Sequence, residues 1–248
     1  MINIRSSEEI ELIRGSARLV AQSLDLAAKL IRPGVTTGEL DREIENFIRS
    51  HGGAPEFKGF RGYPAAICTS IDEEVVHGIP GERVLEEGSI VGIDIGVRKN
   101  GYVGDGARTF AVGEASGEAL SLVGTTLEAL LKGVEVVREG VHLSDVSSAI
   151  QRVAEAKGYS VVRALAGHGV GTELHEPPEV PNYGPPGFGP VLKVGMVLAI
   201  EPMVNAGVAG VRTLEDGWTV VTADNRMSAH FEHTVAVSAE GADILTVV

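Results

Sequence analysis

Apolar residues recur every three or four positions in four segments of the chain, which is the pattern of amphipathic helices. The first two segments each follow a capping box, at residues 6–9 (Ser-Ser-Glu-Glu) and 36–39 (Thr-Thr-Gly-Glu). Glycine or proline follows every segment and favours its end. The sequence therefore predicts helices over about residues 10–31, 40–48, 120–137 and 146–153.

Between the two helix pairs, residues 88–109 carry the pattern of a β-hairpin. A run of Ile and Val leads to Asn100-Gly101, the strongest short signal for a two-residue turn. With these two residues as the loop, Gly96 faces Asp105, and Asp94 lies diagonally from Asp105 on the same face. Two carboxylates so placed repel each other unless a cation lies between them. Two short strands are also expected before the hairpin, at residues 65–70 and 74–79.

The chain contains an internal repeat with an offset of about 106 residues. Residues 31–52 match 137–158 in their Arg, Gly and apolar positions, and residues 88–94 match 195–201. Chance similarity could explain either match alone, but two in the same order are much harder to explain so. We expect a single catalytic domain over residues 1–248, built as two pseudo-two-fold halves of about 1–115 and 116–248.

The repeat gives the acid pair of the hairpin a counterpart. Glu201 aligns with Asp94, and Glu232 lies in the segment that resembles the end of the hairpin. Four carboxylates buried together would be very costly without compensation, which two divalent cations supply most simply. His168, flanked by Gly167 and Gly169, offers an imidazole ligand. The absence of thiolate ligands leaves Mn, Fe, Co and Zn open. The proline-rich residues 177–190 are interpreted as a rim loop.

Composition and charge narrow the class of protein. The 248 residues are 44% hydrophobic and carry a formal net charge of −13, which argues against direct nucleic-acid binding. One cysteine fits a reducing compartment, and no apolar run approaches the roughly 18 residues of a membrane span. A cytoplasmic protein without membrane contact is therefore expected.

An ordered set of short motifs runs along essentially the whole chain and resembles the type I methionine aminopeptidases. These motifs are His77-Gly78-Ile79-Pro80, Asp94, Gly104-Asp105, Gly167-His168-Gly169, His175-Glu176-Pro177-Pro178, Glu201-Pro202-Met203, Asp216-Gly217-Trp218 and Phe231-Glu232-His233. The resemblance implies the pita-bread fold, an α/β (α+β) architecture in which helices back a curved antiparallel sheet. It also implies removal of N-terminal methionine from nascent proteins and peptides, with a preference for a small second residue.

The resemblance assigns roles to the polar residues. Two metal ions would be bound by Asp94, Asp105, His168, Glu201 and Glu232, with Asp105 and Glu232 bridging them. A hydroxide bridging the metals would attack the first peptide bond, and Glu201 would shuttle the proton. His175 would stabilise the tetrahedral intermediate, and His77 would lie near the amide of the following residue.

The resemblance also implies an apolar pocket for the methionine side chain. Its members would be Phe57, Phe60, Tyr63, Cys68 and Trp218, whose soft and aromatic surfaces suit a thioether. The sequence departs from the common family pattern at Phe60 and Leu174, where the family has Tyr and an aromatic residue. Both changes keep the pocket apolar, so a preference for methionine is still expected. The width of the pocket and the efficiency of the enzyme are left open.

Two other functions compete with this interpretation. Prolidase or aminopeptidase P would share the fold but usually carry a large N-terminal domain, which this sequence lacks. A protein of the same fold without catalysis would have lost metal ligands, and all five are present here. The expected partners are peptide substrates and nascent chains, with transient ribosome contact, and the expected state is a monomer.

Overall fold

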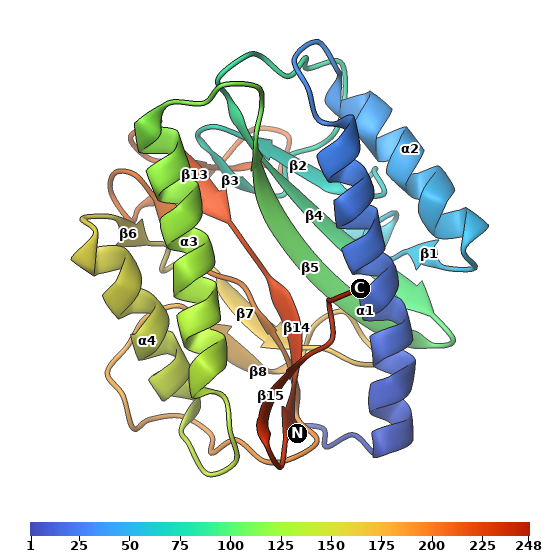
Figure 1. Cartoon of the computed structure of the whole chain (residues 1–248), viewed down its shortest axis with the longest axis vertical. Helices are drawn as coiled ribbons and strands as arrows, with labels where there is room; N and C mark the ends of the chain where they lie inside the picture. The colour runs from blue at the N-terminus through green and yellow to red at the C-terminus, as the bar shows by residue number, and fades with distance from the viewer.

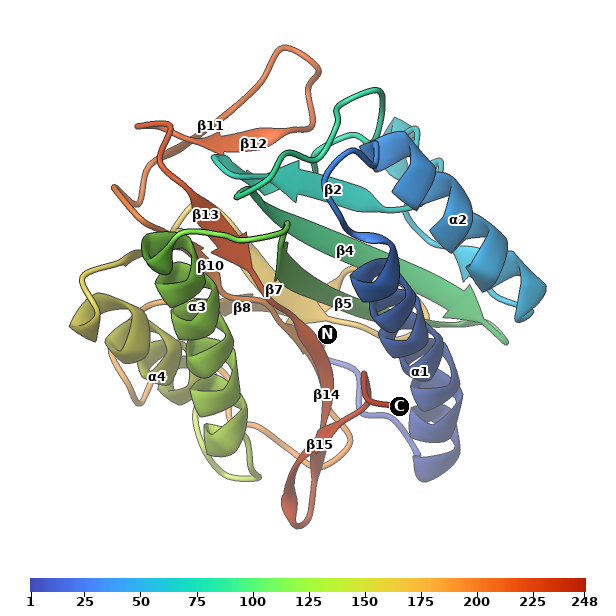
Figure 2. The same cartoon turned by 45° about the horizontal axis from the view of Figure 1, so that its top comes forward.

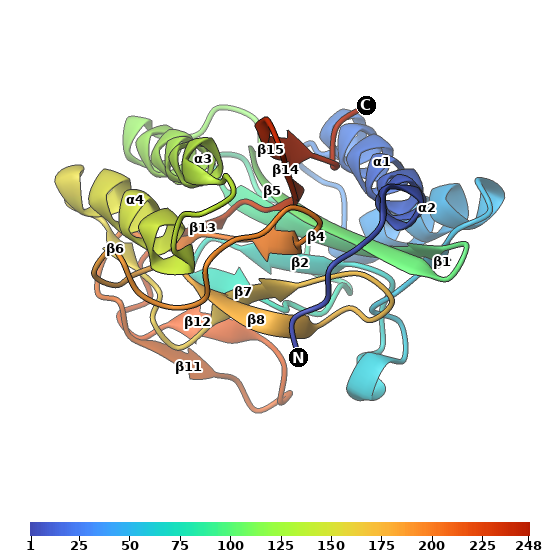
Figure 3. The same ribbon diagram turned by 90° about the horizontal axis from the view of Figure 1, so that it is seen from below.

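The computed structural model describes residues 1–248 as a mixed α/β structure. Four helices lie on one side of an antiparallel arrangement of strands, as Figure 1 and the view from below in Figure 3 show. None of the helices is both long and apolar enough to cross a membrane. The helices are α1 (Ser7–Leu30), α2 (Thr37–Ser50), α3 (Gly117–Val136) and α4 (Leu143–Ala156), with a short 3-10 turn at Phe60–Gly62.

The helices form two pairs, and each pair covers its own hydrophobic core. Residues from α1 and α2 pack around Ile93 and Ile95, which lie in the first strand of the central hairpin. Residues from α3 and α4 pack with the C-terminal strands around Leu198 and Val235. Both predicted capping boxes are confirmed, with reciprocal hydrogen bonds between Ser6 and Glu9 and between Thr36 and Glu39.

All strand pairs are antiparallel. One sheet has the order β1-β4-β2 with β5 beside β4, and a five-stranded sheet has the order β15-β14-β9-β7-β8. Two three-stranded sheets, β13-β10-β6 and β11-β12-β3, complete the structure. The strands are β1 (Ala54–Pro55), β2 (Cys68–Ile71), β3 (Glu74–Val76), β4 (Ile90–Lys99), β5 (Tyr102–Ala111), β6 (Ser160–Val161), β7 (Ala166–Gly169), β8 (Glu176–Pro181), β9 (Val197–Ile200), β10 (Met203–Asn205), β11 (Val211–Thr213), β12 (Val220–Thr222), β13 (Ser228–His230), β14 (His233–Ser238) and β15 (Gly241–Ile244).

The central hairpin has the predicted register. Lys99 pairs with Tyr102 and Gly96 pairs with Asp105 across β4 and β5. The two loop residues both have positive φ, 52° at Asn100 and 83° at Gly101, as a type I′ turn requires. The asparagine and glycine at these positions therefore set the register that brings Asp94 and Asp105 to one face.

Two other predictions are wrong in part. The strands expected at residues 65–70 and 74–79 are shorter, at Cys68–Ile71 and Glu74–Val76. The expected rim loop at 177–190 begins as strand β8, which runs to Pro181 and forms the edge of its sheet. Because an edge strand needs to pair on one side only, prolines are tolerated there.

Strands β5 and β14 cross at the centre of the molecule, where two threonines hold the two parts of the chain together. The hydroxyl of Thr234 accepts from the backbone N–H of Asp105 at 3.0 Å and donates to its carbonyl at 2.7 Å. The hydroxyl of Thr109 accepts from the N–H of His230 at 2.9 Å and donates to its carbonyl at 2.8 Å. We call these contacts the threonine clamps. Figure 2 shows β5, β13 and β14 meeting between the helix pairs.

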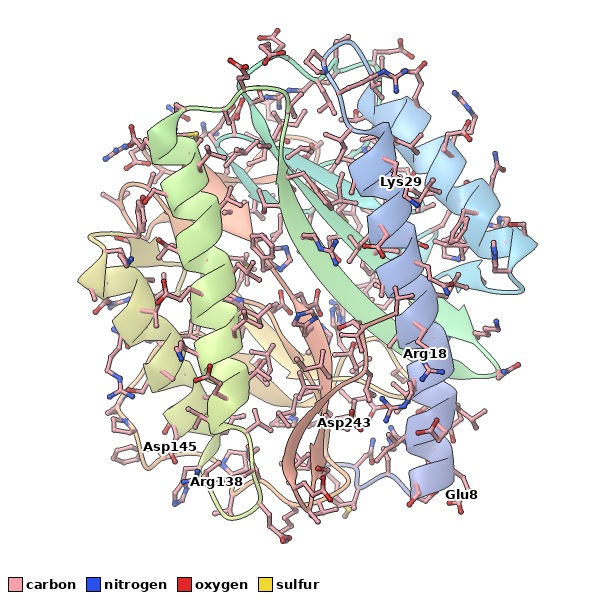
Figure 4. All side chains as sticks on the ribbon, in the orientation of Figure 1. Glu8, Arg18, Lys29, Arg138, Asp145 and Asp243 are labelled. Atoms are coloured by element: carbon pink, nitrogen blue, oxygen red, sulfur yellow. The ribbon has the colours of Figure 1, made fainter.

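An ion pair joins α1 to β15 at the surface. The guanidinium of Arg14 lies 2.6 Å from Asp243 of β15, and its side chain is 16% exposed. Figure 4 shows Asp243 beside α1, with Arg18 and Lys29 further along the same helix. The N-terminal helix is thus fixed to both the central hairpin and the last hairpin of the chain.

The close approach of α1 to β5 depends on Gly104. A Cβ at this position would collide with the backbone of Ser16 and Ala17, which cannot move without shifting the helix. We expect Gly104→Ala to lower the free energy of unfolding by about 1–3 kcal/mol, the usual cost of overpacking. Urea denaturation measures it.

The matched control is Gly124→Ala, on the exposed side of α3, where an added Cβ meets nothing within 4 Å. This change should raise the free energy of unfolding by about 0.5–1 kcal/mol, since it removes backbone freedom from the unfolded chain. Equal effects of the two changes would contradict the argument from packing.

Candidate metal centre and substrate pocket

Every residue that the sequence analysis assigned to the site lines one cavity of about 250 Å³. Further lining residues are Arg61, Val76, Leu165, Ala166, Leu174 and Met203. The predicted residues are Phe57, Phe60, Tyr63, Cys68, His77, Asp94, Asp105, His168, His175, Glu201, Trp218 and Glu232. Segments more than 170 residues apart in sequence therefore meet at one place.

The acidic residues come from four separate strands or strand ends. Asp94 and Asp105 lie on β4 and β5, Glu201 directly follows β9, and Glu232 lies between β13 and β14. Asp105, Glu232 and His168 are buried, and each offers a ligand atom within 4.8 Å of those of the other two. The fold brings these side chains close enough to share metal ions.

His168 lies where the pairing of β7 with β8 changes register. Such an irregularity can redirect a side chain. The two neighbouring glycines are required for close packing, because a Cβ on Gly167 would meet the carbonyl of Ala199 and one on Gly169 that of Pro177. The His168 Nε2 consequently lies 3.4 Å from Glu201 Oε1 and 3.9 Å from Asp105 Oδ2.

The electrostatics of the cavity oppose charge on every one of these groups. Burial raises the pKa of Asp94 to about 7 and that of Glu201 to about 8, and it raises those of Asp105 and Glu232 as well. Mutual repulsion among the carboxylates adds to the shift at Asp105 and Glu232. Burial lowers the pKa of His168 to about 4, so its imidazole is neutral and can act as a ligand.

The donor set fits divalent cations. Buried atoms Oδ1 of Asp94 and Oε1 of Glu232 have no hydrogen-bond partner in the protein. Buried polar atoms are normally paired, so these oxygens point to a missing partner of positive charge. Carboxylates with one neutral imidazole suit first-row divalent metals.

Two further histidines border the cavity. His175 lies at its exposed mouth, and its ring packs edge-on to those of His168, at 4.3 Å between centroids, and Phe60, at 5.3 Å. Burial lowers the pKa of His77 to about 4 and also lowers that of His175, where Arg61 contributes. Both rings are therefore neutral hydrogen-bonding groups near neutral pH.

The segment that carries His175 is anchored to the N-terminus of the chain. Glu176 accepts hydrogen bonds from Asn3 at 2.6 Å, from Arg5 at 2.5 and 2.6 Å, and from the backbone N–H groups of Thr172 and Glu173. Burial tends to raise the pKa of Glu176, but these hydrogen bonds hold it below its usual value. The sequence analysis placed Glu176 only within a motif and overlooked its contact with Arg5.

An apolar wall faces the carboxylates. The rings of Tyr63 and Trp218 pack edge-on with centroids 5.1 Å apart, and Gly96 leaves room for Phe57, whose ring a Cβ there would meet at 2.6 Å. Burial raises the pKa of the Cys68 thiol, so this cysteine is not a thiolate nucleophile. The wall could accept an apolar or thioether side chain next to the polar groups.

His230 is a polar residue of the site that the sequence analysis missed. It is 3% exposed, and its Nε2 lies 3.6 Å from Oε2 of Glu201 with no hydrogen-bond partner. The sequence offered one indication that His230 belongs to the site, namely its position two residues before Glu232. Period-2 alternation on an extended segment puts residues 230 and 232 on the same face.

Comparisons with known proteins agree on one family. The sequence pattern of "Metallopeptidase family M24" matches residues 11–239. A methionine aminopeptidase of Clostridium perfringens is 51% identical over 248 residues, covering 100% of both chains. The crystal structure of methionine aminopeptidase from Thermotoga maritima is 44% identical with a TM-score of 0.99, again over 100% of both chains. Prolidase from Pyrococcus furiosus is 26% identical with a TM-score of 0.79. This match covers 99% of the present chain and 65% of the prolidase chain.

The buried ion pair between Arg5 and Glu176 allows a test of the N-terminal anchor. Removing one partner of such a pair leaves an uncompensated charge, so Arg5→Ala should lower the free energy of unfolding at pH 7 by about 2–4 kcal/mol. Because the pKa of Glu176 is lowered on folding, this stabilisation is present above its usual value of 4.5 and is lost as the pH falls through the folded pKa. Urea denaturation at several pH values measures it.

The control is Arg18→Ala, on the exposed side of α1, with no ion pair. It should change the free energy of unfolding by no more than about 0.5 kcal/mol. A loss at Arg5 no larger than that at Arg18 would show that the pair does not anchor the segment.

Proposed function

The chain belongs to metallopeptidase family M24, among the methionine aminopeptidases, and we propose that it removes N-terminal methionine from nascent proteins and peptides whose second residue is small. One observation carries the proposal. A single cavity combines the complete set of acidic and imidazole groups with an apolar wall of suitable chemistry for a thioether. The preference for a small second residue is inferred from the family.

The proposed cofactors are two divalent metal ions per chain, of Mn, Fe, Co or Zn. Asp94, Asp105, His168, Glu201 and Glu232 would hold them, with Asp105 and Glu232 shared between the two. The unpartnered oxygens of Asp94 and Glu232 and the raised pKa values of all four carboxyl groups support this assignment. Such ions, when bound, supply an activated water molecule and polarise the peptide carbonyl.

The protein's own groups would complete the reaction. Glu201 holds and passes on the proton that the attacking water loses, because it is a carboxylate at the edge of the cluster, with its side chain 14% exposed. His175, at the mouth of the cavity, donates a hydrogen bond to the oxygen on which negative charge develops. His77 binds near the amide of the second substrate residue.

The apolar wall would bind the methionine side chain. Phe57, Phe60, Tyr63, Cys68 and Trp218 line the same cavity as the carboxylates, so a side chain seated among them leaves the first peptide bond near the polar groups. Leu174 is buried there and keeps the wall apolar. The absence of an aromatic residue at position 174 would widen this end of the pocket.

We further propose one catalytic domain of two related halves, about 1–115 and 116–248. The reciprocal threonine clamps and the matching helix pairs support this division. Action on nascent chains would place the protein in the cytoplasm as a monomer in transient contact with the ribosome. Its acidic charge disfavours direct binding to nucleic acid.

A peptide assay tests the function. Purified protein loaded with Mn²⁺ or Co²⁺ should cleave Met-Ala-Ser and leave Ala-Pro peptides intact, and a chelator should abolish the activity. Cleavage of Ala-Pro in preference to Met-Ala-Ser would favour the prolidase-like alternative. Protein that binds two metals yet cleaves no Met-Ala peptide with any divalent ion would contradict the proposal.

Asp105→Asn tests the shared metal ligand. Loss of a charge between two cations should weaken metal binding and reduce activity by at least about a thousandfold, beyond the 10–100-fold typical of outer-shell changes. Metal content by elemental analysis and turnover of Met-Ala-Ser measure the two effects. The control is His175→Ala, which should lower turnover while both metals stay bound. Near-normal activity of Asp105→Asn would exclude the dinuclear arrangement.

A further inference from the structure

His230 is a buried imidazole for which the proposed metal centre has no assigned role. It ends strand β13, is 3% exposed, and lies behind the residues that line the cavity rather than among them. Its Nε2 is buried without a hydrogen-bond partner, and the carboxylate nearest to it is that of Glu201, with 3.6 Å between Nε2 and Oε2. An unpaired buried polar atom is costly, so its retention in this position requires an explanation.

The threonine clamps show that the position of His230 is controlled as closely as that of a metal ligand. Thr234 holds the N–H and the carbonyl of Asp105, and Thr109 holds the same two groups of His230. Each threonine stands four residues after the residue that the other one holds. By these contacts it is His230, and not Glu232 as the repeat in the sequence indicated, that occupies in the second half the place of Asp105 in the first.

The two oxygens of Glu201 face different imidazoles. Oε1 lies 3.4 Å from Nε2 of His168, and Oε2 lies 3.6 Å from Nε2 of His230. The second distance exceeds a hydrogen bond by only about half an ångström, which a small rotation of the glutamate side chain removes. Each oxygen of Glu201 therefore has its own imidazole neighbour.

We propose that His230 is a positioning residue whose Nε2–H donates a hydrogen bond to Oε2 of Glu201, which would fix the orientation of this carboxylate in the metal site. A hydrogen bond in this direction requires the tautomer of the imidazole that carries its proton on Nε2. A partner that orients a ligating carboxylate in this way is typical of metal sites. The inference rests on the proposed function of Glu201.

A pair of substitutions of similar size separates the hydrogen bond from packing. His230→Leu removes the donor, and His230→Gln places an amide N–H near the position of Nε2. We expect His230→Leu to lower kcat on Met-Ala-Ser by about 10- to 100-fold, with KM and the content of two metals little changed. His230→Gln should keep kcat within about threefold of the unchanged protein.

Two kinetic results would overturn the proposal. One is retention of kcat within twofold by His230→Leu, and the other is an equal loss in His230→Gln and His230→Leu. If the unchanged protein cleaves no Met-Ala peptide, the proposed function fails instead.

A spectroscopic measurement tests the hydrogen bond without activity. In ¹⁵N-labelled protein loaded with diamagnetic Zn²⁺, which keeps Glu201 ionised, Nε2 of His230 should carry the proton, and the nitrogen shifts of the neutral ring report this directly. Absence of the signal from His230→Gln assigns it. A neutral ring protonated at Nδ1 would overturn the proposal even if the variants fail to fold.

Discussion

The mutual repulsion of four carboxylates in one small cavity is the constraint on which the rest of the structure depends. Asp94, Asp105, Glu201 and Glu232 all have raised pKa values, chiefly through burial, and none has a lysine or arginine partner. Without a compensating cation, side chains in such a cluster would move apart or take up protons. The fold must therefore hold their backbones in place, and it does so with strands from both parts of the chain.

The threonine clamps are the contacts that make this placement rigid. A single buried hydroxyl satisfies both the N–H and the carbonyl of a residue on the other half, so neither Asp105 nor His230 can shift along its strand without breaking two hydrogen bonds. Each such bond contributes about 1 kcal/mol, and an unmade one costs more when it is buried. The backbone beneath the site is thus fixed before any metal ion binds.

Local rules were enough to predict much of this from the sequence. The Asn100-Gly101 turn sets the register of the hairpin, and the capping boxes set the starts of α1 and α2. The internal repeat then related Glu201 to Asp94, although no local rule connects residues more than 100 positions apart. What escaped prediction depends on tertiary pairing. Arg5 meets Glu176 across 171 positions, β8 becomes an edge strand despite its prolines, and His230 faces Glu201 only through β13.

A near-symmetric backbone therefore carries an asymmetric set of side chains. One clamp holds the backbone of Asp105, whose carboxylate can bridge two cations, and the other holds the backbone of His230, whose neutral imidazole cannot. A peptide is itself asymmetric, with a free amine and side chain on one side of the scissile bond and the rest of the chain on the other. Two identical halves would present the same groups to both sides. An acid at one clamp and a neutral donor at the other make the two sides of the centre chemically different, while the backbone keeps its two-fold form.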